Sequence, residues 1–408
     1  MDTVKSRNSR LIWQVAGFVG LGAAVLAGID AWSWFGLGED PNELWTEANR
    51  AVEMGRFDTL EKDLARLARL RKPTPSDTML SAQLMLSQRR PDKAIAELLA
   101  IPEDHRFGSQ AKFQIGQIEL RRHRLRLAEW AFLEAIRLEP TAVRPRRELV
   151  YIYGMQSRWN ELAKQFRELG KVTPLSVDDL ILWCLSRSLS WRAEEITDDL
   201  RRFVEADPTD RWSRLALAEN LSRRQFLDEA EQVVSTLSLD DADVRAFRAK
   251  LALDRGEVDR AEELLKAGPG EHPALARLRG KLALQRRDGE EALRQFKKSL
   301  ESDPAHRETL NGMAQSLLML GRADEAKPYQ QLTKDYDALG ILVERLASRS
   351  FPREPAFYKR LAEAYEKVER FEEARAWFRL VVTLNPLDTA AQRSLYRLRS
   401  EELPSPAP

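Results

Sequence analysis

Small side chains recur along this chain at a regular spacing, and this pattern limits the folds that the chain can adopt. Ten positions, most of them small, form one series: Ala48, Ala82, Gly116, Val150, Cys184, Ala218, Ala249, Gly280, Ala314 and Ala362. Twelve residues after each lies a second apolar series: Leu60, Ala94, Ala128, Leu162, Ile196, Ala230, Ala261, Ala292, Ala326 and Ala374. Both advance by 34 residues five times, by 31 twice, by 34 once and by 48 once. This phase predicts a tandem repeat.

The segment 355–386 indicates what one repeat is. Its apolar residues have the spacing of one face on each of two successive helices: Leu361, Ala362 and Tyr365, then Ala374, Phe378 and Val381. The polar stretch 367–371 between them has the length of a helix–helix connection. Pro386 ends the second helix because proline cannot continue it. A pair of this kind cannot cover its own apolar face, so the copies are expected to stack.

This unit resembles the tetratricopeptide repeat (TPR), a helix–turn–helix family. The motif's positions are filled by Tyr358, Leu361-Ala362, Tyr365, Ala374, Phe378 and Pro386. The resemblance implies an all-α fold, a right-handed superhelical solenoid of TPR units whose concave groove is lined by the first helix of each pair. We expect repeats one to nine over 41–337 and repeat ten over 355–386.

Other segments flank or interrupt the array. Residues 36–40 are predicted as a linker, 338–354 as an inserted short helix and bend, 387–402 as a capping helix and 403–408 as a disordered tail. Pro352 and Pro355 predict the bend, since proline breaks a helix. A terminal helix with a polar outer face suits the end of a solenoid.

The amino-terminal residues predict a membrane anchor. Residues 1–10 form a basic flank, and 11–35 form an apolar segment whose core, 11–29, has Gln14 as its one strongly polar member. A helix of that core spans about 28 Å, close to the hydrocarbon thickness of a bilayer. The basic flank favours the cytoplasmic side. We therefore expect a single-pass transmembrane signal-anchor, with the repeats on the extracytoplasmic (periplasmic) side in a bacterium.

Two alternatives to this anchor stay open. The first is a cleaved secretory signal, because Val25-Leu26-Ala27 has the small-residue spacing of a signal-peptidase site. The second is the layout of a mitochondrial outer-membrane receptor, in which an amino-terminal anchor precedes repeats that face the cytosol.

Composition argues against several classes of function. A net charge of +1 disfavours a nucleic-acid partner, because phosphate binding relies on a positive excess. The four histidines lack metal-ligand spacing, and there is no glycine-rich phosphate loop or nucleophile elbow. The one cysteine, Cys184, lies in the small-residue series, which predicts a packing role. We expect no enzyme activity, no cofactor, no metal and no small-molecule substrate.

The resemblance also implies a partner-binding groove. The family's groove-facing positions in repeats three to six select Phe113, Arg121, Arg144, Arg147, Tyr151, Ile181, Leu185 and Trp212. This surface would be basic and aromatic at repeats three and four, then apolar at five and six. It would suit a protein or peptide with an acidic end and apolar anchors. The alternative is that the arginines are simply solvated.

The predicted function is a membrane-anchored scaffold that mediates protein–protein interaction without catalysis. The alternative is a secreted or regulatory, substrate-binding subunit of a separate enzyme or export machine. In that case the enzyme would be another chain, because 22 residues follow the last repeat, too few for a catalytic domain.

Overall fold

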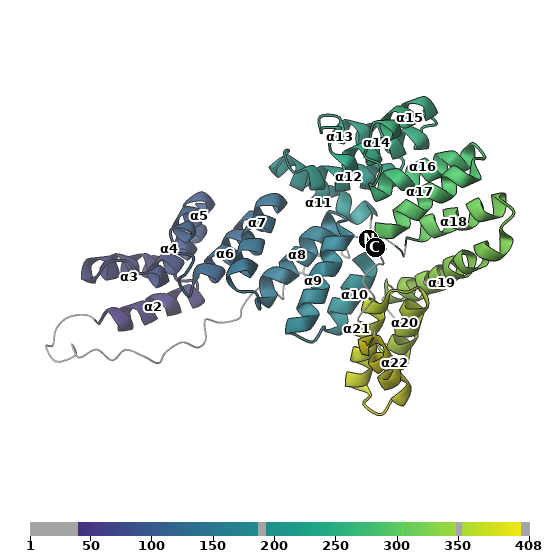
Figure 1. The fold of residues 1–408 in the computed structure, drawn as a ribbon. Coiled ribbons are helices and arrows are strands. Elements are labelled where there is room, and N and C mark those ends of the chain that lie inside the picture. The colour runs from purple at the N-terminus through teal and green to yellow at the C-terminus, as the bar shows by residue number, and fades with distance from the viewer. Residues whose placement is uncertain (1–39, 187–192, 303, 305, 348–352, 401–408) are drawn as a thin grey trace, which may run out of the picture. The chain divides into compact units, whose positions relative to one another are not determined.

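The computed structural model describes residues 40–186, 193–302, 304, 306–347 and 353–400 (Figure 1). These residues form 21 α-helices and no strand, which confirms the predicted all-α class. The basic flank 1–10, the anchor 11–35 and the tail 403–408 lie outside the described residues, as does all but one residue of the linker 36–40. Among the helices that are described, none has both the length and the apolar character that a bilayer crossing needs.

The chain divides into two units, 1–72 and 73–408. The first contains one helical hairpin, α2 (Pro41–Glu53) and α3 (Phe57–Leu70). Asp40 caps α2, because its carboxylate accepts a hydrogen bond from the Asn42 N–H at 2.9 Å. Ala48 of α2 and Leu60 of α3, the two predicted crossing residues, are both fully buried.

The second unit continues with helices that pair in chain order. Its antiparallel neighbours are α4 (Pro75–Ser87) with α5 (Pro91–Leu99), α6 (Gly108–Arg121) with α7 (Leu125–Leu138), α8 (Val143–Met155) with α9 (Trp159–Val172), α12 (Arg211–Arg223) with α13 (Leu227–Val234), α14 (Ala242–Asp254) with α15 (Val258–Lys266), α16 (Pro273–Gln285) with α17 (Gly289–Ser302), α18 (Arg307–Met319) with α19 (Ala323–Ala347), and α20 (Pro355–Lys367) with α21 (Phe371–Leu384). The last helix, α22 (Thr389–Ser400), packs on α21. This is the helical-repeat architecture that the spacing predicts.

The residues at the helix crossings are buried, as their spacing predicts. All ten members of the first series are buried, and so are nine of the ten members of the second. Gly116 shows why these positions are small, since a Cβ atom there would lie 2.4 Å from the ring of Phe132. The one exception is Ile196, which is half-buried.

Most hairpins turn through one residue in the left-handed backbone region. The residues with positive φ are Gly55, Arg89, His123, Ser157, Gln225, Gly256, Arg287, Gly321 and Glu369. The N–H of the next residue donates to the carbonyl five residues earlier, as from Glu257 to Ala252 at 2.8 Å, the 6→1 bond of a Schellman motif. This conformation strains every residue type except glycine.

We expect Gly256→Ala to lower the free energy of unfolding by about 1 kcal/mol. Its φ is +77° and no atom lies within 4 Å of an added Cβ, so the cost would be backbone strain and not a clash. Gly270→Ala is the matched control, because that site is equally open and is not among the positive-φ glycines. Urea unfolding followed by circular dichroism measures both, and equal effects would contradict the argument.

The fifth predicted repeat does not close into a hairpin. Helix α10 (Val177–Ser186) packs on α9, α19 and α21, whereas α11 (Ala193–Ala206) pairs with α12. The crossing residue Cys184 is instead covered by Trp377 of α21, whose indole N–H donates to the sulfur at 3.3 Å. The hairpin α20–α21 thus takes the place on α10 that the repeat pattern assigns to α11.

The inserted segment 338–354 also differs from its prediction. Residues 338–347 are not a separate short helix, because α19 runs unbroken from Ala323 to Ala347. The apolar residues Leu339, Val343 and Leu346 keep the helical spacing and are buried. They belong to the core cluster that also contains Trp183 and Cys184 of α10. The extension of α19 therefore covers α10 where the chain returns to it.

Candidate interaction surface on the first helices of the repeats

Helices α6 and α8 share one exposed, basic surface. Arg121 of α6 and Arg144 and Arg147 of α8 are exposed. Burial raises the pKa of the Glu148 carboxyl, and a hydrogen bond with Gln117 and the charge of Arg121 oppose that rise. Gln117 and Arg121 lie on α6, so the Glu148 carboxyl of α8 is close enough to α6 to be affected by its polar groups.

Tyr151 lies on α8 one helical turn after Arg147. It is 37% exposed, yet loss of hydration raises the pKa of its hydroxyl to about 12, with smaller contributions from the charges of Asp199 and Glu148. A side chain that is accessible but poorly hydrated has protein on several sides. Asp199 belongs to α11, so this face of α8 looks toward α11.

The two exposed arginines of α8 differ in whether they form an ion pair. The Arg147 guanidinium donates to Asp179 at 3.1 Å, and that carboxylate also accepts from the Ser176 N–H at 3.0 Å at the start of α10. Arg147 therefore joins α8 to α10. Arg144 forms no ion pair with any residue that the structure describes, so its charge is available to a ligand.

The apolar residues predicted for the groove are largely used in packing. Phe113 is half-buried, with its ring centroid 5.7 Å from that of Phe132. Ile181 and Leu185 are half-buried against the core.

Trp212 lies between two guanidinium groups, with Arg158 4.9 Å and Arg211 4.0 Å from its ring centroid. Ile181, Leu185 and Trp212 thus contact neighbouring side chains, and the apolar surface expected at repeats five and six stays a prediction.

A second charged surface, not predicted above, lies on α12, α14, α16 and α18. Burial raises the pKa of Glu219, although Arg223, Lys250 and Arg277 oppose the rise. Burial is the largest single effect on Glu308 and would raise its pKa, but the hydrogen bond from Lys281 at 2.5 Å and the charges of Lys281 and Arg277 together outweigh burial and lower the pKa. A signal was present, because Glu219, Lys250 and Lys281 follow one another at the 31-residue spacing of the shortened repeats.

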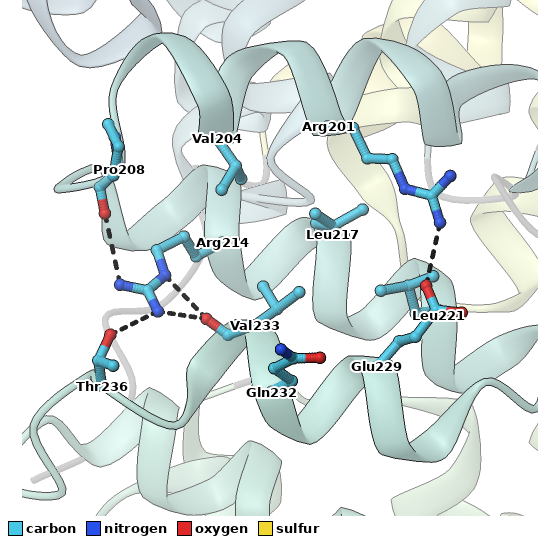
Figure 2. Close-up of a pocket in the computed structure, with 10 residues that line it drawn as sticks. All are labelled: Arg201, Val204, Pro208, Arg214, Leu217, Leu221, Glu229, Gln232, Val233 and Thr236. Atoms are coloured by element: carbon cyan, nitrogen blue, oxygen red, sulfur yellow. Dashed lines mark hydrogen bonds and ion pairs between the residues drawn. The ribbon is translucent and has the colours of Figure 1, made fainter.

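A hollow of about 450 Å³ lies between α11, α12 and α13. Figure 2 shows the residues that line it. Val204, Leu217 and Val233 are among its lining residues, and Arg201 and Glu229 pair across one end at 3.0 Å. The hollow arises because α13 has 8 residues whereas α11 has 14.

Arg214 closes the end of the short helix α13. Its guanidinium donates to the carbonyl of Val233 at 2.8 Å and to the hydroxyl of Thr236 at 2.6 Å (Figure 2). These bonds supply the partner that the last carbonyls of a helix lack. Arg201, Arg214 and Glu229 of the hollow are therefore engaged in bonds that hold the fold.

Catalytic and metal chemistry find little support among the described residues. No group of three or more His, Cys, Asp or Glu side chains is placed there to hold a metal ion. Burial raises the pKa of the Cys184 thiol to about 11, which keeps it protonated at neutral pH and unsuited to act as a nucleophile.

Residues 277–338 and 337–389 match the family model described as tetratricopeptide repeat. This region runs from α16 to the first residue of α22, and the match supports a TPR protein. No curated protein matches the chain significantly.

Among solved structures, the chain is similar to a tetratricopeptide repeat protein from Parabacteroides merdae, at 17% identity, covering 68% of this chain and 98% of that one, with a TM-score of 0.32. It is similar to the APC/C hetero-tetramer Cut9–Hcn1 at 12% identity, with coverage of 88% and 90% and a TM-score of 0.39. It is also similar to PilF of Pseudomonas aeruginosa at 16% identity, with coverage of 50% and 96% and a TM-score of 0.28.

Proposed function

We propose that this chain is a non-catalytic TPR scaffold that captures a protein partner on the surface formed by α6 and α8. The observation that carries the proposal is the exposed, basic surface beside Tyr151, where the Arg144 charge is left without a counter-ion among the described residues. TPR proteins generally act by protein–protein interaction, which agrees with this assignment.

The chemistry of the surface favours an acidic segment of the partner. Arginine binds carboxylates through two parallel hydrogen bonds, so Arg121 and Arg144 suit Asp and Glu side chains or a carboxyl terminus. Tyr151, which follows Arg144 by seven residues on α8, offers an amphipathic ring against which an apolar side chain of the partner can pack. An extended or helical peptide with acidic and apolar residues fits this surface.

The sequence of residues 1–35 supports a membrane tether for the scaffold. Its basic flank and its apolar stretch of about one bilayer thickness suit a single-pass anchor, with the repeats extracytoplasmic in a bacterium. We expect the full chain to remain in the membrane pellet after alkaline carbonate extraction. Complete release into the supernatant would contradict the tether.

Arg144→Glu tests the binding surface. We expect this variant to keep its helicity and melting temperature but to bind its partner about tenfold more weakly, because a like charge would then face the acidic segment. The partner is first identified by crosslinking in the native membrane, and its affinity is then measured with purified protein. Arg147→Glu is unsuitable, since it would also place two carboxylates together at Asp179.

Lys164→Glu is the matched control. Lys164 is exposed on α9, the second helix of the same hairpin, and the substitution changes the net charge equally. It should leave the affinity unchanged. Equal affinity of both variants and the parent would show that the α6–α8 surface is not the site. An enzyme as the crosslinked partner would favour the alternative of a regulatory or substrate-binding subunit.

A further inference from the structure

The face of α10 that carries Cys184 is covered by a hairpin from far along the chain. Trp377, 193 residues away in sequence, donates its indole N–H to the Cys184 sulfur. At the rim, Arg167 of α9 pairs with Glu372 of α21 at 3.3 Å. The Arg379 guanidinium of α21 also donates to the Gly170 carbonyl at 3.4 Å.

Helix α11 keeps the sequence register of the helix that would cover this face in a regular repeat. Ile196 follows Cys184 by the same twelve residues that separate the two crossing positions in the other repeats. It is the one crossing residue of its series that is half-buried, while its nine counterparts are buried. Its position is thus suited to a contact that the present arrangement does not make.

Both apolar packing and polar contacts hold α11 and α12 where they are, with Leu200 and Phe203 of α11 buried in the core. Arg126, at the start of α7, donates to Asp207 at 3.0 Å just after α11 ends. Gln156, at the end of α8, donates to Asp210 at 3.0 Å just before α12 begins. The first contact is partly exposed and the second is buried, so a move of α11 requires these groups to regain partners from water or from the new arrangement.

We propose that α20–α21 and α11 compete for the same face of α10. In the arrangement of the structure the carboxy-terminal hairpin is docked. Its release lets α11 pair with α10 as the second helix of the fifth repeat. This exchange does not depend on which partner the α6–α8 surface binds.

The distribution of charge makes release feasible. The most deeply buried charged groups of the hairpin, Arg370 and Glu373, pair with each other and would leave α10 together. Release therefore leaves neither charge buried without its counter-ion. Such an unpaired buried charge is what makes breaking a buried ion pair costly. The pair that it does break, Arg167 with Glu372, is partly exposed, with side chains 44% and 29% accessible.

Thiol labelling of the full chain tests the release. Cys184 is the only cysteine in the sequence and is 3% exposed, so Ellman's reagent reaches it only while the face of α10 is uncovered, after the hairpin leaves and before α11 pairs. We expect Glu372→Arg, which sets two cations against each other, to react about tenfold faster than the parent at unchanged helicity. The double variant Arg167→Glu with Glu372→Arg should restore the parent rate. Equal rates in all three proteins would overturn the proposal.

A second cysteine tests whether α11 pairs with α10 after the hairpin is released. Ile196→Cys should form an intramolecular disulfide with Cys184 under mild oxidation, and more of it when combined with Glu372→Arg. Asp198→Cys is the control, because it is exposed two residues further along α11 and should form none. The product is read by peptide mass spectrometry. If Glu372→Arg accelerates labelling but the 184–196 disulfide does not form, or if Asp198→Cys couples equally, α11 does not take the place of the hairpin.

Discussion

Replacing Phe296 by alanine is expected to lower the free energy of unfolding by about 3–5 kcal/mol. The side chain is 1% exposed on α17 and fills the space between two glycines of neighbouring helices. A Cβ atom would lie 2.8 Å from its ring at Gly280 of α16 and 2.5 Å at Gly312 of α18. The helices meet across this ring, so its loss leaves a hole that their backbones cannot close.

Hydrogen exchange is the most direct measurement for Phe296→Ala. A repeat array need not unfold in one step, so the loss should appear first in the amides of α16 to α19, with urea unfolding giving the total. Leu318→Ala is the control, because Leu318 lies on α18 but is 47% exposed. Its effect should stay within about 0.5 kcal/mol. Equal losses in the two variants would mean that Phe296 does not hold these helices together.

Glu373→Gln is expected to cost about 3–5 kcal/mol, because it leaves the buried Arg370 charge without its counter-ion. The Arg370 Nε donates to the Glu373 carboxylate at 2.8 Å, and the two side chains are 10% and 9% exposed. Burial disfavours the Arg370 charge, but Glu373 and Tyr365 outweigh this effect and raise the pKa of the guanidinium. Glutamine keeps the shape of the side chain, so the measured loss would report the missing charge.

Two comparisons separate the charge effect from a general loss of packing. Arg322 and Glu325 form the same pair in the predicted ninth repeat but are 41% and 58% exposed, so Glu325→Gln should have a much smaller effect than Glu373→Gln, because solvent screens an exposed pair. The double variant Arg370→Met with Glu373→Leu should regain most of the stability, since apolar residues often replace a buried pair without loss. Urea unfolding of the four proteins checks this order, and similar losses at Glu325 and Glu373 would contradict it.

The repeat phase is the part of the fold that could be predicted from sequence. It follows from local rules, because the residues that meet inside one hairpin lie about a dozen positions apart and must be small or apolar. The same rules assigned α11 to α10, since Ile196 has the right offset from Cys184. Local rules do not include contacts from distant segments. The indole of Trp377, 193 residues away, covers Cys184, and the local spacing does not predict this contact.

For the candidate surface, the sequence identified exposed arginines but not their partners. Position within the repeat sufficed to place Arg121 and Arg144 on the surface. It did not reveal that Arg147 is engaged by Asp179, because that contact depends on how α8 and α10 pack. The unbroken extension of α19 could not be predicted for a related reason. Its residues Leu339 and Val343 share a core cluster with residues of α10, which is distant in sequence.

The packing of α21 on α10, which are far apart in sequence, has a consequence for folding during translation. A ribosome adds roughly 5–20 residues per second, so about 10–40 s pass between the emergence of Cys184 and that of Trp377. During this interval the apolar face of α10 has been synthesised, but helix α21, which covers it in the structure, has not. The nascent chain therefore has time to form the regular hairpin with α11 first, and the mature arrangement would then be reached by exchange after translation ends.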